Sequence, residues 1–365
     1  MKISDVISHL ESIAPPSLQE GYDNAGLITG NPDWECKGII TALDSTVEVI
    51  EEAILKGCNL VVAHHPIIFS GLKKINGKNY VEKAVISAIR NDIAIYAIHT
   101  NLDNVLSGVN GRMADQLGLI NRHTLFTKPA VLKKLYTFVP LEQAEQVKRA
   151  LFTAGAGHIG NYDECSFGVE GTGTFRGLEG THPFAGKKGE RHSEKEIKLE
   201  VIFPAYQQST IIKSLLAAHP YEEVAYDILS LDNHHPGIGS GLLGELPEEL
   251  DEKEFLGLLK TRFRLPLVRH TALLNRRVKK IAVCGGAGSF LISKALAAGA
   301  DIYISADIKY HEFFDANQRL VVCDIGHFES EQFTVDLLHE VLQEKFLNFA
   351  VLKTGVKTNP VHYFM

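Results

Sequence analysis

Histidines and carboxylates gather at four points of this 365-residue chain, each just after an apolar run. The four segments read VVAHHP, YAIHTNLD, ISADIKYH and VVCDIGHFESE. Imidazole nitrogens and carboxylate oxygens are common ligands of zinc, manganese and ferrous iron. The pattern therefore indicates a metal site.

The consecutive pair His64 and His65 is the strongest of these signals. On a regular strand two neighbours point to opposite faces, but Pro66 ends the strand ladder and frees both side chains to turn the same way. The two imidazoles could then reach two different metal ions. The alternative is a structural, hydrogen-bonded role, which we expect for three single histidines, His219, His270 and His339.

Carboxylates complete the predicted ligand set. Asp103 could bridge two cations, although a turn-forming or helix-capping role is equally open. His327 and Glu331 are four residues apart at a predicted helix start, which places them on one helix face. Capping of the final helix is the alternative for this pair, and Glu329 is a competing carboxylate in the same loop.

Three imidazoles and two carboxylates exceed by one the ligands of a closed tetrahedral zinc site. Two ions about 3.5 to 4 Å apart, sharing a carboxylate and a water, would use them all. The sequence therefore predicts two divalent metal ions per subunit, with zinc, manganese and iron all acceptable. The predicted ligands are His64, His65, Asp103, His327 and Glu331.

A glycine turn, CGGAGS at 284–289, separates a predicted strand from a predicted helix. Its backbone amides could hold a phosphate. It matches neither the dinucleotide fingerprint nor the phosphate-loop consensus, since no lysine follows. We therefore favour a purely structural turn and keep an anion site as the alternative.

The elements that must position these residues alternate between helix and strand in both end regions of the chain. An amphipathic helix is predicted over Ile3–Ile13, and short, continuously apolar strands separated by helices follow it. The same order returns from about Lys279, and it is typical of parallel sheets covered on both faces. We predict an α/β fold of two related lobes with mainly parallel sheets, at 1–127 and 237–365. The second lobe completes the metal site, because ligands bind beyond the carboxyl ends of parallel strands.

Residues 128–236 differ in character from the two ends. Their pattern predicts a strand, a helix and a Gly-rich strand region, then strand, helix and strand. This order is typical of a ferredoxin-like α+β domain. We predict that it is inserted between the two lobes.

Composition narrows the class of function and the compartment. A formal net charge of -7 argues against a sequence-independent nucleic-acid binder, so a small molecule is the expected partner. No apolar run approaches the roughly 18 residues of a membrane span, and Asp5 and Glu11 interrupt the N-terminal segment, unlike a signal peptide. Five dispersed cysteines without a CxxC pair fit a cytoplasmic protein, with Cys284 and Cys323 as buried core thiols.

Six motifs in order give the chain a close resemblance to the Nif-three-like family, whose members are often labelled GTP cyclohydrolase 1 type 2 homologues. They are YDNAGL at 22–27, ALDST at 42–46, AHHPIIF at 63–69, HTNLD at 99–103, ADIKYH at 306–311 and GHFESE at 326–331. The resemblance spans nearly the whole chain. Ala306 stands where that family's motif is expected to have glycine, which bears on the local turn and not on the ligands.

The resemblance implies a dinuclear metal site on the same five residues. It also implies an inserted extra domain at 128–236 and a toroidal homohexamer with the metal ions facing an internal cavity. The family label suggests ring opening of GTP or a related nucleotide.

We therefore predict a metal-dependent hydrolase. His99 or Glu329 is the candidate to carry the proton, and Lys309 or Arg112 the candidate to hold a phosphate. The alternative is a metal-binding regulatory or partner-binding protein without turnover, in which the inserted domain senses a small ligand or docks a partner.

Overall fold

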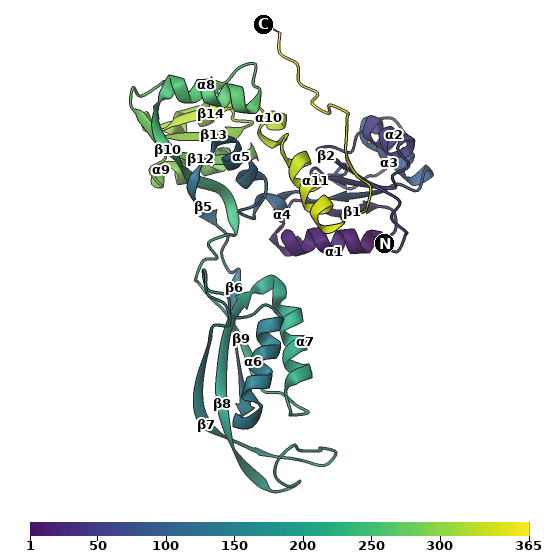
Figure 1. The fold of residues 1–365 in the computed structure, drawn as a ribbon, viewed down its shortest axis with the longest axis vertical. Coiled ribbons are helices and arrows are strands. Elements are labelled where there is room, and N and C mark those ends of the chain that lie inside the picture. The colour runs from purple at the N-terminus through teal and green to yellow at the C-terminus, as the bar shows by residue number, and fades with distance from the viewer. Residues whose placement is uncertain (365) are drawn as a thin grey trace. The chain divides into compact units, whose positions relative to one another are not determined.

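The computed structural model describes residues 1–364, which fall into two compact units (Figure 1). Residues 1–127 and the chain from Gly237 onward form one, called here the main unit. Lys128–Pro236 form the other, called the middle unit. Each has its own apolar core.

The first sheet of the main unit has five strands in the order β1-β4-β3-β2-β15. They are β1 (Gly26–Thr29), β2 (Ile39–Ala42), β3 (Leu60–Ala63), β4 (Ala94–Ala97) and β15 (Val351–Lys353). The strands β15, β2, β3 and β4 run parallel, and β1 pairs antiparallel to β4 at the edge. Every residue of β2, β3 and β4 is buried, as their continuous apolar character predicts.

Helices cover both faces of this sheet. The helices α2 (Val47–Leu55) and α3 (Tyr80–Arg90) share a core with Ile40, Val61 and Ile95. Because side chains alternate along a strand, Thr41 and Tyr96 point the other way. Thr41 there donates to a carbonyl of α11 (Thr334–Lys345), and Tyr96 to a carboxylate of α1 (Ile3–Ile13). The bounds predicted for the first helix are confirmed.

The second sheet has six strands in the order β11-β14-β13-β12-β10-β5. They are β5 (Ile120–Thr127), β10 (Gly239–Asp251), β11 (Arg269–His270), β12 (Arg277–Ala287), β13 (Ile302–Ala306) and β14 (Val321–Asp324). Only β12, β13 and β14 pair in parallel. The expectation of mainly parallel sheets is therefore wrong for this sheet. Its added strand β5 is partly exposed, and antiparallel strands tolerate one solvated face.

Further helices join and flank these strands. They are α4 (Thr100–Asp103), α5 (Val109–Leu117), α8 (Glu252–Phe263), α9 (Ile292–Ala297) and α10 (His327–Glu331), with short 3-10 turns at Pro16–Leu18, Ser289–Leu291 and Tyr310–Ala316. Among residues 1–364 no helix combines the length and the apolar character that a membrane crossing requires. Cys284 and Cys323 are buried free thiols, as predicted.

The two sheets exchange strands. The strand β5 from the first third of the chain lies in the second sheet, and β15 from the C-terminus extends the first sheet beside β2. The sequence pattern assigned β15 to the C-terminal lobe, because three apolar residues carry no information about which strand they will pair with. Short strands find their neighbours only in the folded chain.

The middle unit is a four-stranded antiparallel sheet in the order β7-β8-β6-β9. Its elements are β6 (Leu132–Pro140), α6 (Ala144–Thr153), β7 (Ser166–Arg176), β8 (Arg191–Pro204), α7 (Gln208–Ala218) and β9 (Tyr226–Ser230), with 3-10 turns at Leu141–Gln143 and Ala205–Gln207. Both helices pack on one face of this sheet (Figure 1). Leu135, Leu199 and Val201 belong to the core that they cover.

Candidate metal centre

Carboxyl ends of strands from both sheets of the main unit supply the histidines and carboxylates singled out in the sequence. His64 and His65 directly follow β3, and Asp103 ends the short helix α4 that follows β4. His327 and Glu331 begin and end α10, two residues beyond β14. The strand ends therefore bring together residues up to 267 positions apart in the chain.

One group of three ligand atoms is compact. The Nε2 atoms of His65 and His327 lie 3.3 Å apart, and Glu331 Oε2 is 2.9 Å from the first and 3.2 Å from the second. Atoms that each lie about 2.0–2.1 Å from one tetrahedral cation are about 3.3 Å from one another. The spacing matches a shared ion.

A second, wider group adjoins it. His64 Nε2 lies 3.6 Å from Asp103 Oδ1 and 3.8 Å from Glu331 Oε1. Glu331 thus directs one oxygen toward each group, which is the position of a bridging carboxylate. The sequence pattern suggested Asp103 for that role; it contacts the second group, and Glu331 stands between the two.

Buried polar atoms that lack hydrogen-bond partners show whether these residues are suited to bind cations. Among the described residues, His64 Nε2, Asp103 Oδ1 and Glu331 Oε2 are buried without a geometrically acceptable hydrogen-bond partner. An unpaired buried polar atom costs about 1–3 kcal/mol. All three atoms are of types that bind divalent cations, so bound ions would satisfy them. The donor set fits a metal centre.

Hydrogen bonds to Nδ1 orient all four histidines at the site. The partners are Ile98 O for His64 (2.9 Å), Asp44 for His65 (2.8 Å), Asp23 for His99 (2.7 Å) and Asp307 for His327 (2.7 Å). Since these oxygens only accept, Nδ1 carries the proton and Nε2 presents its lone pair to a metal. The sequence reasoning did not assign these aspartates, although they lie in three of the motifs that carried the resemblance.

Charge around the centre shifts its proton equilibria. Burial lowers the pKa of His65, but the neighbouring carboxylates of Asp44 and Glu331 outweigh it and raise that pKa to about 9. Burial also lowers the pKa of His327, but the Asp307 and Glu331 carboxylates outweigh this effect and raise that pKa to about 11. Burial and the Glu331 charge raise the pKa of Asp103 to about 7. Without cations the centre therefore retains protons that ligation must displace.

The glycine turn after β12 makes room for Glu331. Gly286 has φ +63°, and a Cβ there would stand 2.4 Å from Glu331 Oε1. The amides of Gly285 and Gly286 donate to Asn110 Oδ1 and Ser330 Oγ. These two donors are thus not available to a phosphate, and the turn serves the carboxylate.

Of the residues that the sequence offered as proton carriers or phosphate ligands, only His99 lies among the ligand atoms. His99 joins His64 and His65 in a group whose ring nitrogens lie within 4.8 Å of one another. Glu329 instead accepts a hydrogen bond of 2.9 Å from Asn359. Arg112 is engaged by Glu340 and Asp115, while Lys309 is exposed. No described contact ties Glu329, Arg112 or Lys309 to the ligand atoms.

Known proteins match the chain along almost its whole length. The family described as Duf34/NIF3 (NGG1p interacting factor 3) matches residues 1–360. A GTP cyclohydrolase 1 type 2 homolog of Halalkalibacterium halodurans is 39% identical over 99% of both chains, and one of Bacillus subtilis is 37% identical over 97% of this chain and 96% of its own. The crystal structure of a Bacillus cereus protein related to NIF3 superposes with a TM-score of 0.87 at 38% identity, covering 100% of this chain and 99% of that one.

Proposed function

The chain belongs to the Duf34/NIF3 family, and from this premise we propose that it is a hydrolase dependent on two divalent cations. The observation that carries the proposal is the position of Glu331, with one carboxylate oxygen toward each of two groups of ligand atoms. Two adjacent cations that share a carboxylate are common in hydrolytic metal centres.

The proposed ligands divide between the two ions. His65, His327 and Glu331 would hold one, and His64, Asp103 and Glu331 would hold the other. Zinc, manganese and iron are all compatible with this nitrogen and oxygen set. When bound, the ions polarise a substrate and lower the pKa of an attached water toward neutrality.

His99 is the proposed proton carrier. Asp23 accepts from its Nδ1 and also from the hydroxyl and amide of Thr100. Burial opposes ionisation of Asp23, but these hydrogen bonds prevail and lower its pKa to about 2. An ionised Asp23 fixes the His99 tautomer and stabilises the imidazolium when His99 takes up a proton. Glu329, bound to Asn359, is the weaker candidate.

GTP or a related nucleotide is the proposed substrate, and its support is the label that the relatives carry. Lys309 is an exposed cation two residues from Asp307, the partner of His327, and it is the candidate to meet a phosphate. The decisive assay is turnover of GTP and a panel of phosphoesters by protein of measured metal content.

A proton-carrier role predicts a specific kinetic result. His99→Gln should keep full metal content and lose about 100-fold or more in kcat. Glu331→Gln should lose metal and activity together. Fully metal-loaded wild-type protein without turnover of any substrate in the panel would refute the hydrolase.

That last result would favour a metal-binding regulatory protein without turnover, the second candidate. A separate middle unit with its own pocket supports this reading.

The same proposal includes the architecture. Two related α/β lobes, 1–127 and 237–365, flank an inserted ferredoxin-like domain at 128–236, and six subunits form a ring in the cytoplasm. The strand order β7-β8-β6-β9 with both helices on one face supports the ferredoxin-like assignment. Light scattering tests the ring, with about 241 kDa expected for six chains of 40.2 kDa.

A further inference from the structure

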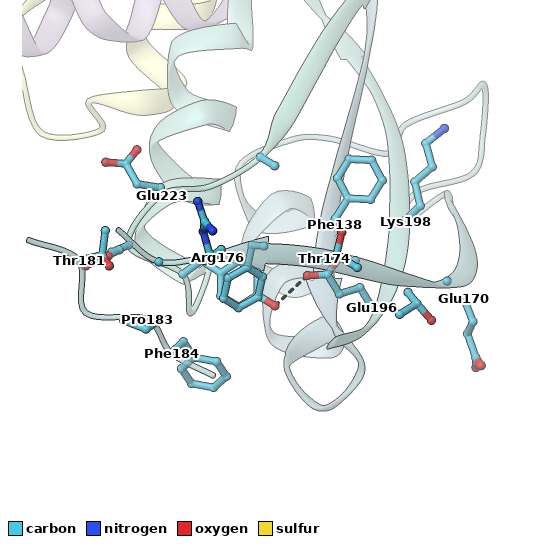
Figure 2. Close-up of a pocket in the computed structure, with 18 of the residues that line it drawn as sticks. Phe138, Glu170, Thr174, Arg176, Thr181, Pro183, Phe184, Glu196, Lys198 and Glu223 are labelled. Carbon is cyan, nitrogen blue, oxygen red and sulfur yellow. Dashed lines mark hydrogen bonds between the residues drawn. The ribbon is translucent and has the colours of Figure 1, made fainter. Parts of the chain in front are cut away.

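The middle unit contains a pocket of about 830 Å³, on the sheet face that its helices leave uncovered (Figure 2). Leu135, Leu199 and Val201 face the helices. Because side chains alternate, Phe138, Glu196 and Lys198 project from the opposite face and line the pocket. A volume of 300–1,000 Å³ is typical of small-molecule sites.

Aromatic rings form one wall of the pocket. Phe175 at the end of β7 and Phe184 on the following loop both contact Tyr221, with ring centroids 5.8 and 6.1 Å away and rings tilted by 59° and 51°. All three line the pocket, as does Phe138. Aromatic rings that line a pocket favour apolar groups, and a ring face that is open to the pocket also favours cations.

A buried carboxylate lies among these rings. Glu196 is only 7% exposed, and its Oε1 accepts a hydrogen bond of 2.7 Å from the Tyr221 hydroxyl (Figure 2). Among the described residues that hydroxyl is its single hydrogen-bonding partner. Gly173 permits this arrangement, since a Cβ there would stand 2.0 Å from Oε2. Burying a carboxylate with one neutral partner is costly, and a cation would offset that cost.

The ionisable side chains that line the pocket carry a net negative charge. Its charged side chains are five carboxylates, Glu170, Glu196, Glu200, Glu222 and Glu223, and two cations, Arg176 and Lys198. Lys198 is already paired with Glu200 at 2.8 Å. The remaining charge therefore favours a positively charged occupant and disfavours a phosphate or carboxylate.

From the cavity, its rings and the buried Glu196, we propose that the middle unit binds a small organic cation with an apolar body. The cationic group sits against the Glu196 carboxylate and the faces of Tyr221 and Phe175. The apolar body occupies the space toward Phe138 and Phe184. This site is independent of the metal centre, and its occupancy does not depend on metal content.

Benzyltrimethylammonium is a suitable probe, because its charge does not change with pH. Titration calorimetry and ligand-observed NMR on the full-length protein should show binding of this cation. The anion phenylacetate and the neutral 2-phenylethanol, which share its phenyl ring but not its positive charge, should bind at least tenfold more weakly.

Variants locate the site. Glu196→Gln keeps the size and the hydrogen bond but removes the charge, and it should weaken binding of benzyltrimethylammonium at least tenfold. Tyr221→Phe should weaken it less. Glu142→Gln, at an exposed carboxylate of the same unit outside the pocket, should bind like the wild type. Circular dichroism confirms that each variant is folded.

Three results would overturn the proposal. They are absence of benzyltrimethylammonium binding at millimolar concentration, equal binding of phenylacetate, and binding unaffected by Glu196→Gln. Since the assay needs no metal, failure of the hydrolase proposal leaves it standing, and the reverse also holds.

Discussion

At the scale of single residues, the candidate metal centre depends on carboxylates outside the proposed ligand set. Asp44 accepts from His65 Nδ1 and also from the hydroxyl of Thr358, which lies in the C-terminal segment. Asp307 does the same for His327, although its backbone has φ 54°, a conformation that few residues other than glycine adopt. These aspartates hold both rings with Nε2 near the Glu331 carboxylate.

Substitution of Asp44 should therefore weaken metal binding without removing a ligand. Asp44→Asn loses the charge that supports His65, and we expect metal affinity to fall by about 10- to 100-fold. Competition with a chromophoric chelator measures it. Asp336→Asn, at an exposed ion pair with Lys353, serves as the control and should leave affinity unchanged. Equal affinity in both variants would contradict an orienting role for Asp44.

The raised pKa values of His65 and His327 predict proton release on metal binding. Their pKa values, raised to about 9 and about 11, predict that the metal-free centre retains protons on these rings at pH 7.5. Ligation needs neutral rings, so about two protons leave and affinity rises with pH from 6 toward 9. In the metal-free protein, the stability that these protons contribute is complete below pH 6.5 and is lost as pH rises through both values.

Calorimetry in buffers of different ionisation enthalpy counts the released protons. His65→Ala should release about one proton fewer than the wild type. Metal binding that is independent of pH between 6 and 9 would contradict the protonated state of the centre.

At the scale of elements, the close approach of β12 to α10 positions the shared carboxylate. A Cβ at Gly286 would occupy the space of the Glu331 carboxylate, and one at Gly285 would stand 2.6 Å from the Val109 side chain. The same device recurs in the middle unit, where Gly173 on β7 gives room to Glu196 on β8. In both places a glycine in the strand lets a buried carboxylate lie directly against the strand backbone.

Gly286→Ala tests this packing against a matched control. Gly286 and Gly118 have similar φ values, +63° and +66°, but a Cβ at Gly118 meets nothing within 4 Å. Both alanine variants should lose about 1 kcal/mol from backbone strain, measured by urea unfolding. Only Gly286→Ala should also lose bound metal, measured by elemental analysis. Full metal content in Gly286→Ala would show that the turn does not shape the site.

At the scale of the whole molecule, the candidate metal centre and the pocket that contains Glu196 belong to different compact units. Thr127 at the end of β5 pairs with Gly239 at the start of β10, so the two ends that flank the middle unit meet as cross-strand neighbours. A short loop can join such neighbours without disturbing either strand. The main unit therefore contains a continuous fold without residues 128–236.

Excision of the middle unit tests this separation. Replacing residues 128–236 with four glycine and serine residues should leave a folded main unit that binds metal as the full chain does. The shortened protein should no longer bind benzyltrimethylammonium. Elemental analysis and calorimetry measure the two properties. An insoluble or metal-free product would contradict the independence of the main unit.

Much of this organisation can be read from the sequence because local patterns carry it. Apolar periodicity predicts α1 to its bounds, and the buried strands β2, β3 and β4 follow from their uninterrupted apolar runs. The consecutive histidines before Pro66 and the pair His327 and Glu331 predict metal ligands from residue chemistry alone, and the folded chain brings these residues together. Residue type and spacing are sufficient there, since each element is built from its own neighbours.

Other features exist only in the folded chain. Four such features join segments that are distant in the sequence. They are the pairing of β15 with β2, the antiparallel strands of the second sheet, the aspartates that bind His65, His99 and His327, and the position of Glu331 between two groups of ligand atoms. A local pattern indicates what an atom can bind but not which distant atom will come within 3 Å of it. The packing of sheets and turns decides that distance, and with it the position of Glu331, rather than Asp103, between the two groups of ligand atoms.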